Sequence, residues 1–202
     1  MSENAIFLSA SVPTNPESPY FSSANPFLIQ FAVRELITVA LGRRPIVWGG
    51  HPAITPMIWA ACEDLGVEYD KALVLYQSRF FEELYPEENQ KFSNVMYVEK
   101  IENDRDASLF QMRTEMLSRQ DLTTAVFIGG MDGINDEYSM FTQFHPEAKI
   151  LSVASPGGAA QSLAQRLGAS EAELGDIDFS RMFYQALGVS PADRRDKLNK
   201  TI

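Results

Sequence analysis

Short apolar runs alternate along this sequence with longer stretches of helical periodicity, and no other feature constrains its fold as strongly. The apolar runs are predicted to be strands, at residues 5–10, 45–48, 72–76, 94–98, 125–128 and 149–153. Helices are predicted at residues 26–41, 55–65, 106–119, 134–144, 158–167 and 178–187, with a loop and a short helix at 79–91. Strands separated by helices indicate βαβ units and a parallel sheet. Strands that are apolar almost throughout are typical of a sheet covered on both faces. The predicted fold class is therefore α/β, a single doubly wound Rossmann-like domain with a mainly parallel sheet.

The length of the chain suits one domain, and no linker divides it in two. Its 202 residues are 45% hydrophobic, which is enough for a full core without disulfides or structural metals. We expect residues 1–189 to form the domain and residues 190–202 to form a polar C-terminal tail. The tail is either a frayed terminus or an arm for contact with another subunit.

The charge and the cysteine content exclude several classes of function. The chain carries 17 Lys and Arg against 27 Asp and Glu, a formal net charge of -10. This balance disfavours general nucleic-acid binding and adhesion to an anionic membrane. Cys62 is the only cysteine, so neither an intramolecular disulfide nor a cysteine zinc site can form. Only two histidines are present, far apart in the sequence, so no metal site is expected. We predict a cytoplasmic protein, because no signal peptide or membrane-length apolar run is evident.

Four segments follow predicted strands and are candidates for a binding site. They are residues 9–11, 48–52, 129–133 and 155–158, and three of them contain paired glycines. In open α/β sheets, ligands bind beyond the carboxyl ends of the strands. Glycine loops that lead into helices present backbone N–H groups that suit phosphate. These loops favour a nucleotide-like ligand. No dinucleotide fingerprint, P-loop or G-x-S-x-G elbow is present, so we expect no NAD, FAD or other resident cofactor.

The order of these segments resembles the SLOG superfamily, which includes the LOG-type cytokinin-activating phosphoribohydrolases and several sensor domains. Residues 9–11 (SAS) resemble the Gly-Ser-Ser loop of LOG proteins, and residues 47–51 (VWGGH) resemble their first glycine loop. Residues 111–116 (QMRTEM) stand where LOG proteins carry an arginine, and residues 128–137 (IGGMDGINDE) resemble Pro-Gly-Gly-x-Gly-Thr-x-x-Glu. The string WGGHPAITP is closest to small SLOG branches of prokaryotic conflict and nucleotide-signalling systems. The likeness covers about residues 5–155.

The sequence also departs from the LOG pattern. Ile128 replaces the proline, one extra residue precedes Gly133, and Ile134 replaces the threonine. His51 and Pro52 interrupt the first glycine loop, and the lysine after the arginine is missing. The resemblance therefore implies two functions. The first is a sensor that binds a nucleotide-derived small molecule, and the alternative is an N-glycosidic hydrolase of the phosphoribohydrolase type. It also implies a homodimer or higher homo-oligomer.

The resemblance gives Glu137 and Arg113 the central roles. Glu137 would contact ribose hydroxyls or assist departure of a base, and Asp136 competes for the same role. A structural alternative for Glu137 is a favourable position near a helix dipole. Arg113 would clamp a phosphate or carboxylate. Its structural alternatives are a solvent-facing side chain or an ion pair with Asp106 or Glu115.

The other candidate ligand-binding residues come from the loops: Ser9, Ser11, Gly49, Gly50, His51, Gly129, Gly130, Asp132 and Gly133. Either serine could bind phosphate or tie the loop to its own backbone. His51 is either structural, a donor to phosphate or a group for proton transfer. Asp132 would oppose an anion, so a hydrogen bond to ribose is its alternative role. Phe80, Phe81, Leu84 and Tyr85 are expected to cover the sheet or to form a subunit interface.

Overall fold

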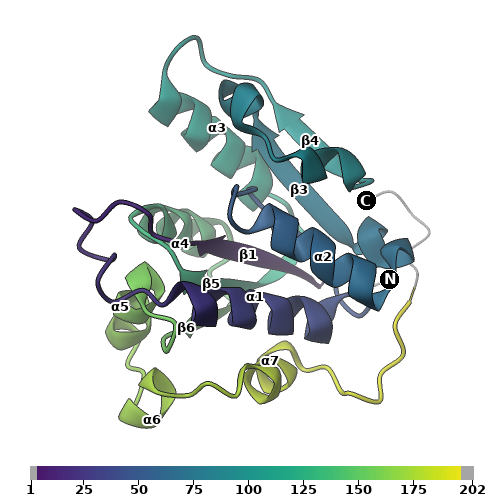
Figure 1. Cartoon of the computed structure of the whole chain (residues 1–202), viewed down its shortest axis with the longest axis vertical. Coiled ribbons are helices and arrows are strands. Elements are labelled where there is room, and N and C mark those ends of the chain that lie inside the picture. The colour runs from purple at the N-terminus through teal and green to yellow at the C-terminus, as the bar shows by residue number, and fades with distance from the viewer. Residues whose placement is uncertain (1–3, 197–202) are drawn as a thin grey trace.

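A six-stranded, all-parallel sheet forms the centre of the molecule. The computed structural model describes residues 4–196 and is drawn in Figure 1. Its strands are β1 (Ala5–Ser11), β2 (Ile46–Trp48), β3 (Leu73–Ser78), β4 (Val95–Val98), β5 (Leu122–Gly129) and β6 (Lys149–Val153). They lie in the order β4-β3-β2-β1-β5-β6, and each pair of neighbouring strands is parallel. The predicted α/β fold with a parallel sheet is confirmed.

Helices cover both faces of the sheet. α1 (Pro26–Ala40), α2 (Thr55–Leu65) and α7 (Phe179–Leu187) pack on one face, and α3 (Arg105–Leu117), α4 (Gly133–Phe144) and α5 (Gly158–Arg166) pack on the other. Three 3₁₀ helices, η1 (Val67–Ala72), η2 (Arg79–Leu84) and η3 (Glu87–Lys91), flank β3 and β4. The short α6 (Glu171–Leu174) was not predicted, although its capping box of Ser170 and Glu173 is visible in the sequence.

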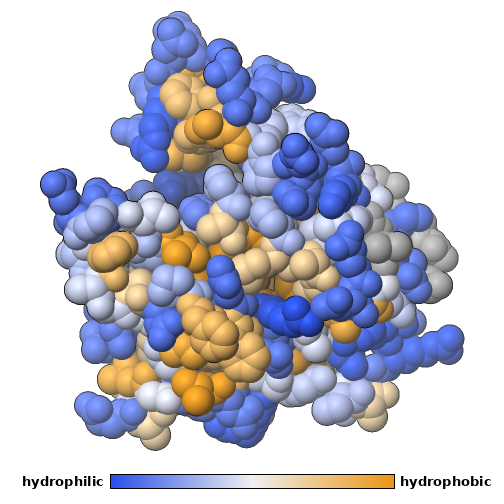
Figure 2. Space-filling model, viewed as in Figure 1, coloured by the Kyte–Doolittle hydropathy of each residue, from blue (hydrophilic) through white to orange (hydrophobic). Residues whose placement is uncertain are grey.

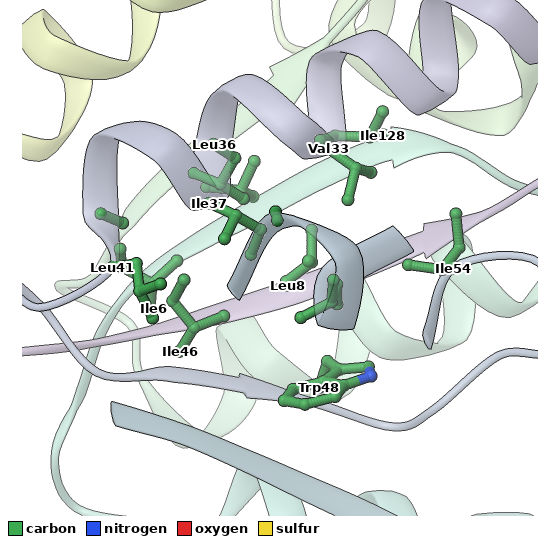
Figure 3. Packing of buried hydrophobic residues seen from close by; sticks show 14 of the residues in the cluster. Ile6, Leu8, Val33, Leu36, Ile37, Leu41, Ile46, Trp48, Ile54 and Ile128 are labelled. Carbon is green, nitrogen blue, oxygen red and sulfur yellow. The ribbon is translucent and has the colours of Figure 1, made fainter. Parts of the chain in front are cut away.

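The apolar strands divide their side chains between two cores. Ile6 and Leu8 of β1 meet α1 on one face, where Leu36 and its neighbours point towards the strand (Figure 3). Phe7 points to the opposite face and stacks on Phe141 of α4 with ring centroids 5.8 Å apart. Each fully buried side chain of this size contributes about 1.5–3 kcal/mol to folding. Because side chains on both faces of the sheet are buried, the strands lack the alternation of apolar and polar residues that a half-exposed sheet shows.

α1 begins where the sequence predicts it. The side chain of Asn25 accepts a hydrogen bond from the N–H of Leu28 at 3.1 Å, and Pro26 occupies the first turn. An asparagine cap followed by proline is a favoured helix start, because proline has no N–H to leave unbonded. The cap therefore fixes where α1 starts, and the helix packs on the sheet face that carries Ile6 and Leu8.

The strand order reverses direction at β1. Strands β2, β3 and β4 are added on one side of β1, whereas the chain then returns to place β5 and β6 on the other side. α4 begins directly after β5, so its first turn lies at the carboxyl edge of the sheet beside the end of β1. Such a reversal opens a crevice in which doubly wound proteins bind ligands.

Part of the predicted tail lies on the domain. The guanidinium of Arg195 donates to the carbonyl oxygens of Thr38 and Leu41, at the end of α1. Arg43 donates to the carbonyl oxygen of Asp193 at 3.0 Å. Residues 197–202 of the predicted tail lie outside the described residues, and its role as a subunit arm stays a prediction.

The helices within the described residues are short or amphipathic. None of them is both long enough and apolar enough to cross a membrane.

Candidate functional site

A large cavity opens at the carboxyl edge of the sheet. Its volume is about 1060 Å³, and its walls come from the end of β1, the loop after β2, η2 after β3, residues 105–113 of α3 and residues 133–140 of α4. Ten of the residues predicted from sequence line it: Ser9, Ser11, Gly49, Gly50, His51, Arg113, Asp132, Gly133, Asp136 and Glu137. Small-molecule sites usually fall between about 300 and 1,000 Å³, so this cavity can hold a ligand of nucleotide size.

Glu137 is held at the cavity wall by two donors from other elements. Its Oε1 accepts from Nε of Arg113 at 3.1 Å, and its Oε2 accepts from Oγ of Ser9 at 2.5 Å. Arg113 lies on α3, Ser9 lies near the end of β1, and Glu137 lies in the second turn of α4. The side chains of Arg113 and Glu137 are each 15% exposed. The network therefore ties together the three elements that meet at the strand-order reversal.

Arg113 also pairs with Asp136, whose Oδ2 lies 3.1 Å from Nη1. The sequence analysis named Asp106 and Glu115 as the alternative ion-pair partners of Arg113, and the structure shows different partners. The Nη2 side of the guanidinium lies against Gly133, where an added Cβ would approach it to 2.8 Å. Cations are disfavoured at a helix N-terminus, so the carboxylates of Asp136 and Glu137 stabilise the arginine in this position.

The first turn of α4 presents backbone donors to the cavity. Within the described part of the chain, no hydrogen bond is found for the N–H groups of Met131, Asp132 and Gly133. The side chain of Asp132 makes no capping bond to the helix. All three residues line the cavity. Free N–H groups and the positive end of a helix dipole together form a site suited to an anion.

His51 is fixed in the loop after β2. Its Nδ1 accepts from the N–H of Ala53 at 3.2 Å, and its own N–H donates to Oγ1 of Thr55 at the same distance. Burial lowers the pKa of His51 below its usual 6.5, because a buried imidazolium loses its hydration. The ring is therefore neutral at pH 7, and with Nδ1 accepting, Nε2 carries the proton and can donate.

Gly129 and Gly130 do not line the cavity. Gly130 donates its N–H to the carbonyl oxygen of Ser11 at 2.8 Å and accepts from the N–H of Ala159 at 3.0 Å. A Cβ on Gly158 would lie 2.7 Å from the carbonyl carbon of Gly129. These glycines allow two backbones to approach closely. The nearby 155–158 loop likewise contacts residues 23–25 and does not line the cavity.

One end of the cavity is apolar and aromatic. Phe81, Leu84 and Tyr85 line it from the segment after β3, and Leu109 and Phe110 line it from α3. Leu84 and Phe110 are exposed. Apolar side chains gather in this region at the top of Figure 2, where Figure 1 draws α3. Three residues of the 80–85 segment, predicted to cover the sheet or to form an interface, thus form a wall of the cavity.

Tyr85 adds a fixed polar group to this apolar wall. Its hydroxyl donates to the carbonyl oxygen of Ser78 at 2.7 Å. Burial, followed by the negative charge of Glu82, raises the pKa of Tyr85 to about 12. The side chain therefore stays neutral at physiological pH.

Gln77 is a cavity residue that the sequence analysis missed. It lies near the end of β3, lines the cavity and is 6% exposed. The candidate strand-end residues were drawn from glycine and serine loops, and no such loop follows β3. The available signal was a glutamine directly after the apolar run of residues 72–76. The cavity also contains no cluster of three or more His, Cys, Asp or Glu placed to hold a metal, as far as the described residues go.

The sequence matches a known protein family. A model of the SLOG cluster3 family matches residues 19–187, well over half of the chain. A search of the curated proteins found no match to the sequence.

Proposed function

The chain belongs to the SLOG cluster3 family, and on this premise we propose that it binds a nucleotide or nucleotide-derived small molecule as a sensor domain. One observation carries the proposal: the cavity at the strand-order reversal combines free backbone donors with a fixed carboxylate and arginine. This combination suits a ligand that has both an anionic group and hydroxyl groups.

The proposed binding mode assigns the two kinds of ligand group to different residues. The phosphate binds the free N–H groups at residues 131–133, supported by donors of Arg113 that its two carboxylate partners leave unused. The ribose hydroxyls donate to Glu137 and Asp136. Nε2 of His51 provides a further donor at the cavity wall. Because acidic side chains outnumber Arg113 here, hydroxyl groups are better partners for the carboxylates than a second anion is.

The proposal is tested by calorimetry and thermal shift with AMP, GMP, CMP, UMP, NAD and cyclic nucleotides. At least one of them should raise the melting temperature of the wild-type protein. Arg113→Met should weaken its binding by about 10-fold or more, since charge-assisted hydrogen bonds to phosphate are lost. Arg34→Met is the matched control, because Arg34 pairs with Asp64 at 2.6 Å outside the cavity. Equal affinity of the Arg113 and Arg34 variants, or no binding by the wild type, would contradict the proposal.

The fixed carboxylate of Glu137 favours a second candidate function, hydrolysis of an N-glycosidic bond. In this reaction, water attacks the anomeric carbon, the bond from carbon to the base nitrogen breaks, and the base leaves with a proton. Glu137 would stabilise the cationic sugar or guide the water, as carboxylates do in glycoside hydrolysis. Its two hydrogen bonds hold the carboxylate in one orientation, which such a role requires.

Mass spectrometry of the same incubations separates the two functions. Release of a free base that is lost in Glu137→Gln would make the protein a hydrolase. A ligand recovered intact, with a thermal shift, would make it a sensor. Glu63→Gln serves as the control, because Glu63 accepts from Nε1 of Trp59 on α2 and does not line the cavity.

A further inference from the structure

Gln77 lines the cavity with a side-chain amide for which no hydrogen-bond partner is found among residues 4–196. The residue is 6% exposed and lines the cavity near the end of β3. None of the side-chain hydrogen bonds found within residues 4–196 includes it, whereas buried Ser108 and Thr124 are both bonded. The amide atoms of Gln77 are not among the fully buried polar atoms that lack a partner, so they reach the cavity, where water or a ligand can bond them. An amide that lines a cavity is available to a ligand.

Gly50 leaves room for this amide. It has φ 63°, and a Cβ at this position would lie 2.2 Å from Nε2 of Gln77. Any side chain at position 50 would therefore displace the amide. The second glycine of the loop after β2 thus acts by making room for a neighbouring polar group, and it need not bind phosphate itself.

The cavity that Gln77 lines suits a flat ring. Phe81, Tyr85 and Leu109 line the same cavity, and Tyr85 stays neutral. Aromatic and aliphatic walls bind the faces of planar ligands, while an amide binds an edge that has both a donor and an acceptor. A nucleobase has both features.

The position of Gln77 in the sheet also agrees with the proposed sugar site. β3 lies two places from β1 in the strand order, which is about 10 Å at the usual spacing of strands. β1 carries Ser9, the partner of Glu137. A ring attached to a sugar can span such a distance.

We propose that Gln77 determines specificity by pairing with the hydrogen-bonding edge of the ligand's nucleobase, a role that rests on the proposed nucleotide-binding function. The amide donates one hydrogen bond to the base and accepts another. The aromatic segment after β3 contacts the faces of the ring. Arg113 and Glu137 bind the phosphate and sugar, so the two ends of the cavity recognise different parts of one molecule.

The test compares the wild type with Gln77→Leu and with Gln143→Leu, a control at an exposed position of α4 outside the cavity. Calorimetry with AMP, GMP, CMP and UMP gives the base preference, and ribose 5-phosphate is the probe without a base. Gln77→Leu should bind the preferred nucleotide about 10- to 100-fold more weakly, as expected for loss of two hydrogen bonds. Its affinity for ribose 5-phosphate should equal that of the wild type, and its melting temperature should be unchanged or higher.

A second variant keeps the test independent of the leucine. Gln77→Glu retains the shape and the acceptor but loses the donor, so it should also lose the base preference. Wild-type affinities of Gln77→Leu for all four nucleotides would overturn this inference and leave the proposed function intact. Loss of ribose 5-phosphate binding together with a lower melting temperature would make Gln77 structural and would also overturn it. Failure of every probe to bind the wild type would overturn the proposed function and this role together.

Discussion

Arg113 makes two ion pairs of equal length whose energies should differ. Its Nε lies 3.1 Å from Oε1 of Glu137, and its Nη1 lies 3.1 Å from Oδ2 of Asp136. The side chain of Glu137 is 15% exposed, whereas that of Asp136 is 62% exposed. Solvent and salt screen the exposed pair much more strongly than the buried one. Burial alone should therefore separate two interactions that distance does not distinguish.

Double-mutant cycles measure each interaction separately. One cycle combines Arg113→Met with Glu137→Gln, and the other combines Arg113→Met with Asp136→Asn. Any change in the hydrogen bond from Ser9 occurs in both backgrounds of the first cycle and cancels. We expect a coupling energy of about 1.5–3 kcal/mol for Glu137, the usual range for a hydrogen bond to a charged group. The coupling for Asp136 should be about 0.2–1 kcal/mol, as for exposed ion pairs.

Urea denaturation followed by fluorescence of Trp48 and Trp59 gives the free energy of unfolding for each variant. In 0.5 M NaCl, the Asp136 coupling should fall further while the Glu137 coupling changes little, since a Debye length of about 4–5 Å screens exposed charges first. Equal couplings for the two carboxylates would refute the reasoning from burial. A Glu137 coupling below about 0.5 kcal/mol would show that the network contributes little to stability.

Two further predictions concern the loops. Gly157→Ala should destabilise the fold by about 3 kcal/mol or more, because its φ is 80° and the new Cβ would lie 1.8 Å from the carbonyl oxygen of Ser23. Gly188→Ala is the control, because Gly188 has φ 64° and open space around it, and this variant should lose only about 1 kcal/mol of stability. Melting curves of the two variants and the wild type measure the difference. Since burial lowers the pKa of His51 in the folded protein, the unfolded chain binds the proton more readily, and the stability from this group should be complete above pH 6.5 and decline as pH falls towards the folded pKa. Melting temperatures from pH 8 to 5 should show a shallower decline in His51→Gln, and identical profiles would exclude this contribution.

The strands and helices were predictable because their signals are local. Six apolar runs lie at the six strands, and a helix start such as Asn25 with Pro26 is written in adjacent residues. The strand order was not predictable from such signals, because it depends on which strands pair over long distances. α6 was not predicted because a four-residue helix is too short to show helical periodicity, although its capping box of Ser170 and Glu173 was present in the sequence.

The candidate site was partly predictable, since parallel strands bring their carboxyl ends to one edge. Arg113, Glu137 and Ser9 meet as the order of segments suggested, but their direct hydrogen bonds depend on side-chain geometry. Gly130 cannot be told from a phosphate-binding glycine by sequence alone. In the structure it packs closely against Ile134, whose Cγ1 would lie 2.4 Å from a Cβ at position 130. Gln77 had only a weak local signal, a glutamine directly after the apolar run of residues 72–76, because its place at the cavity wall depends on the fold.

The pairing of β1 with β5 has a consequence for the time course of folding. These strands join residues 5–11 to residues 122–129, and the hydrogen bond from Ser9 to Glu137 closes a separation of 128 residues. Contacts so distant in sequence form late and slow the folding of a chain. During synthesis, β1 to β4 leave the ribosome before β5 does, so an early four-stranded sheet would expose one edge of β1. The cavity is then completed only in the last long-range step, and a chain arrested before that step would have the loop after β2 without the first turn of α4.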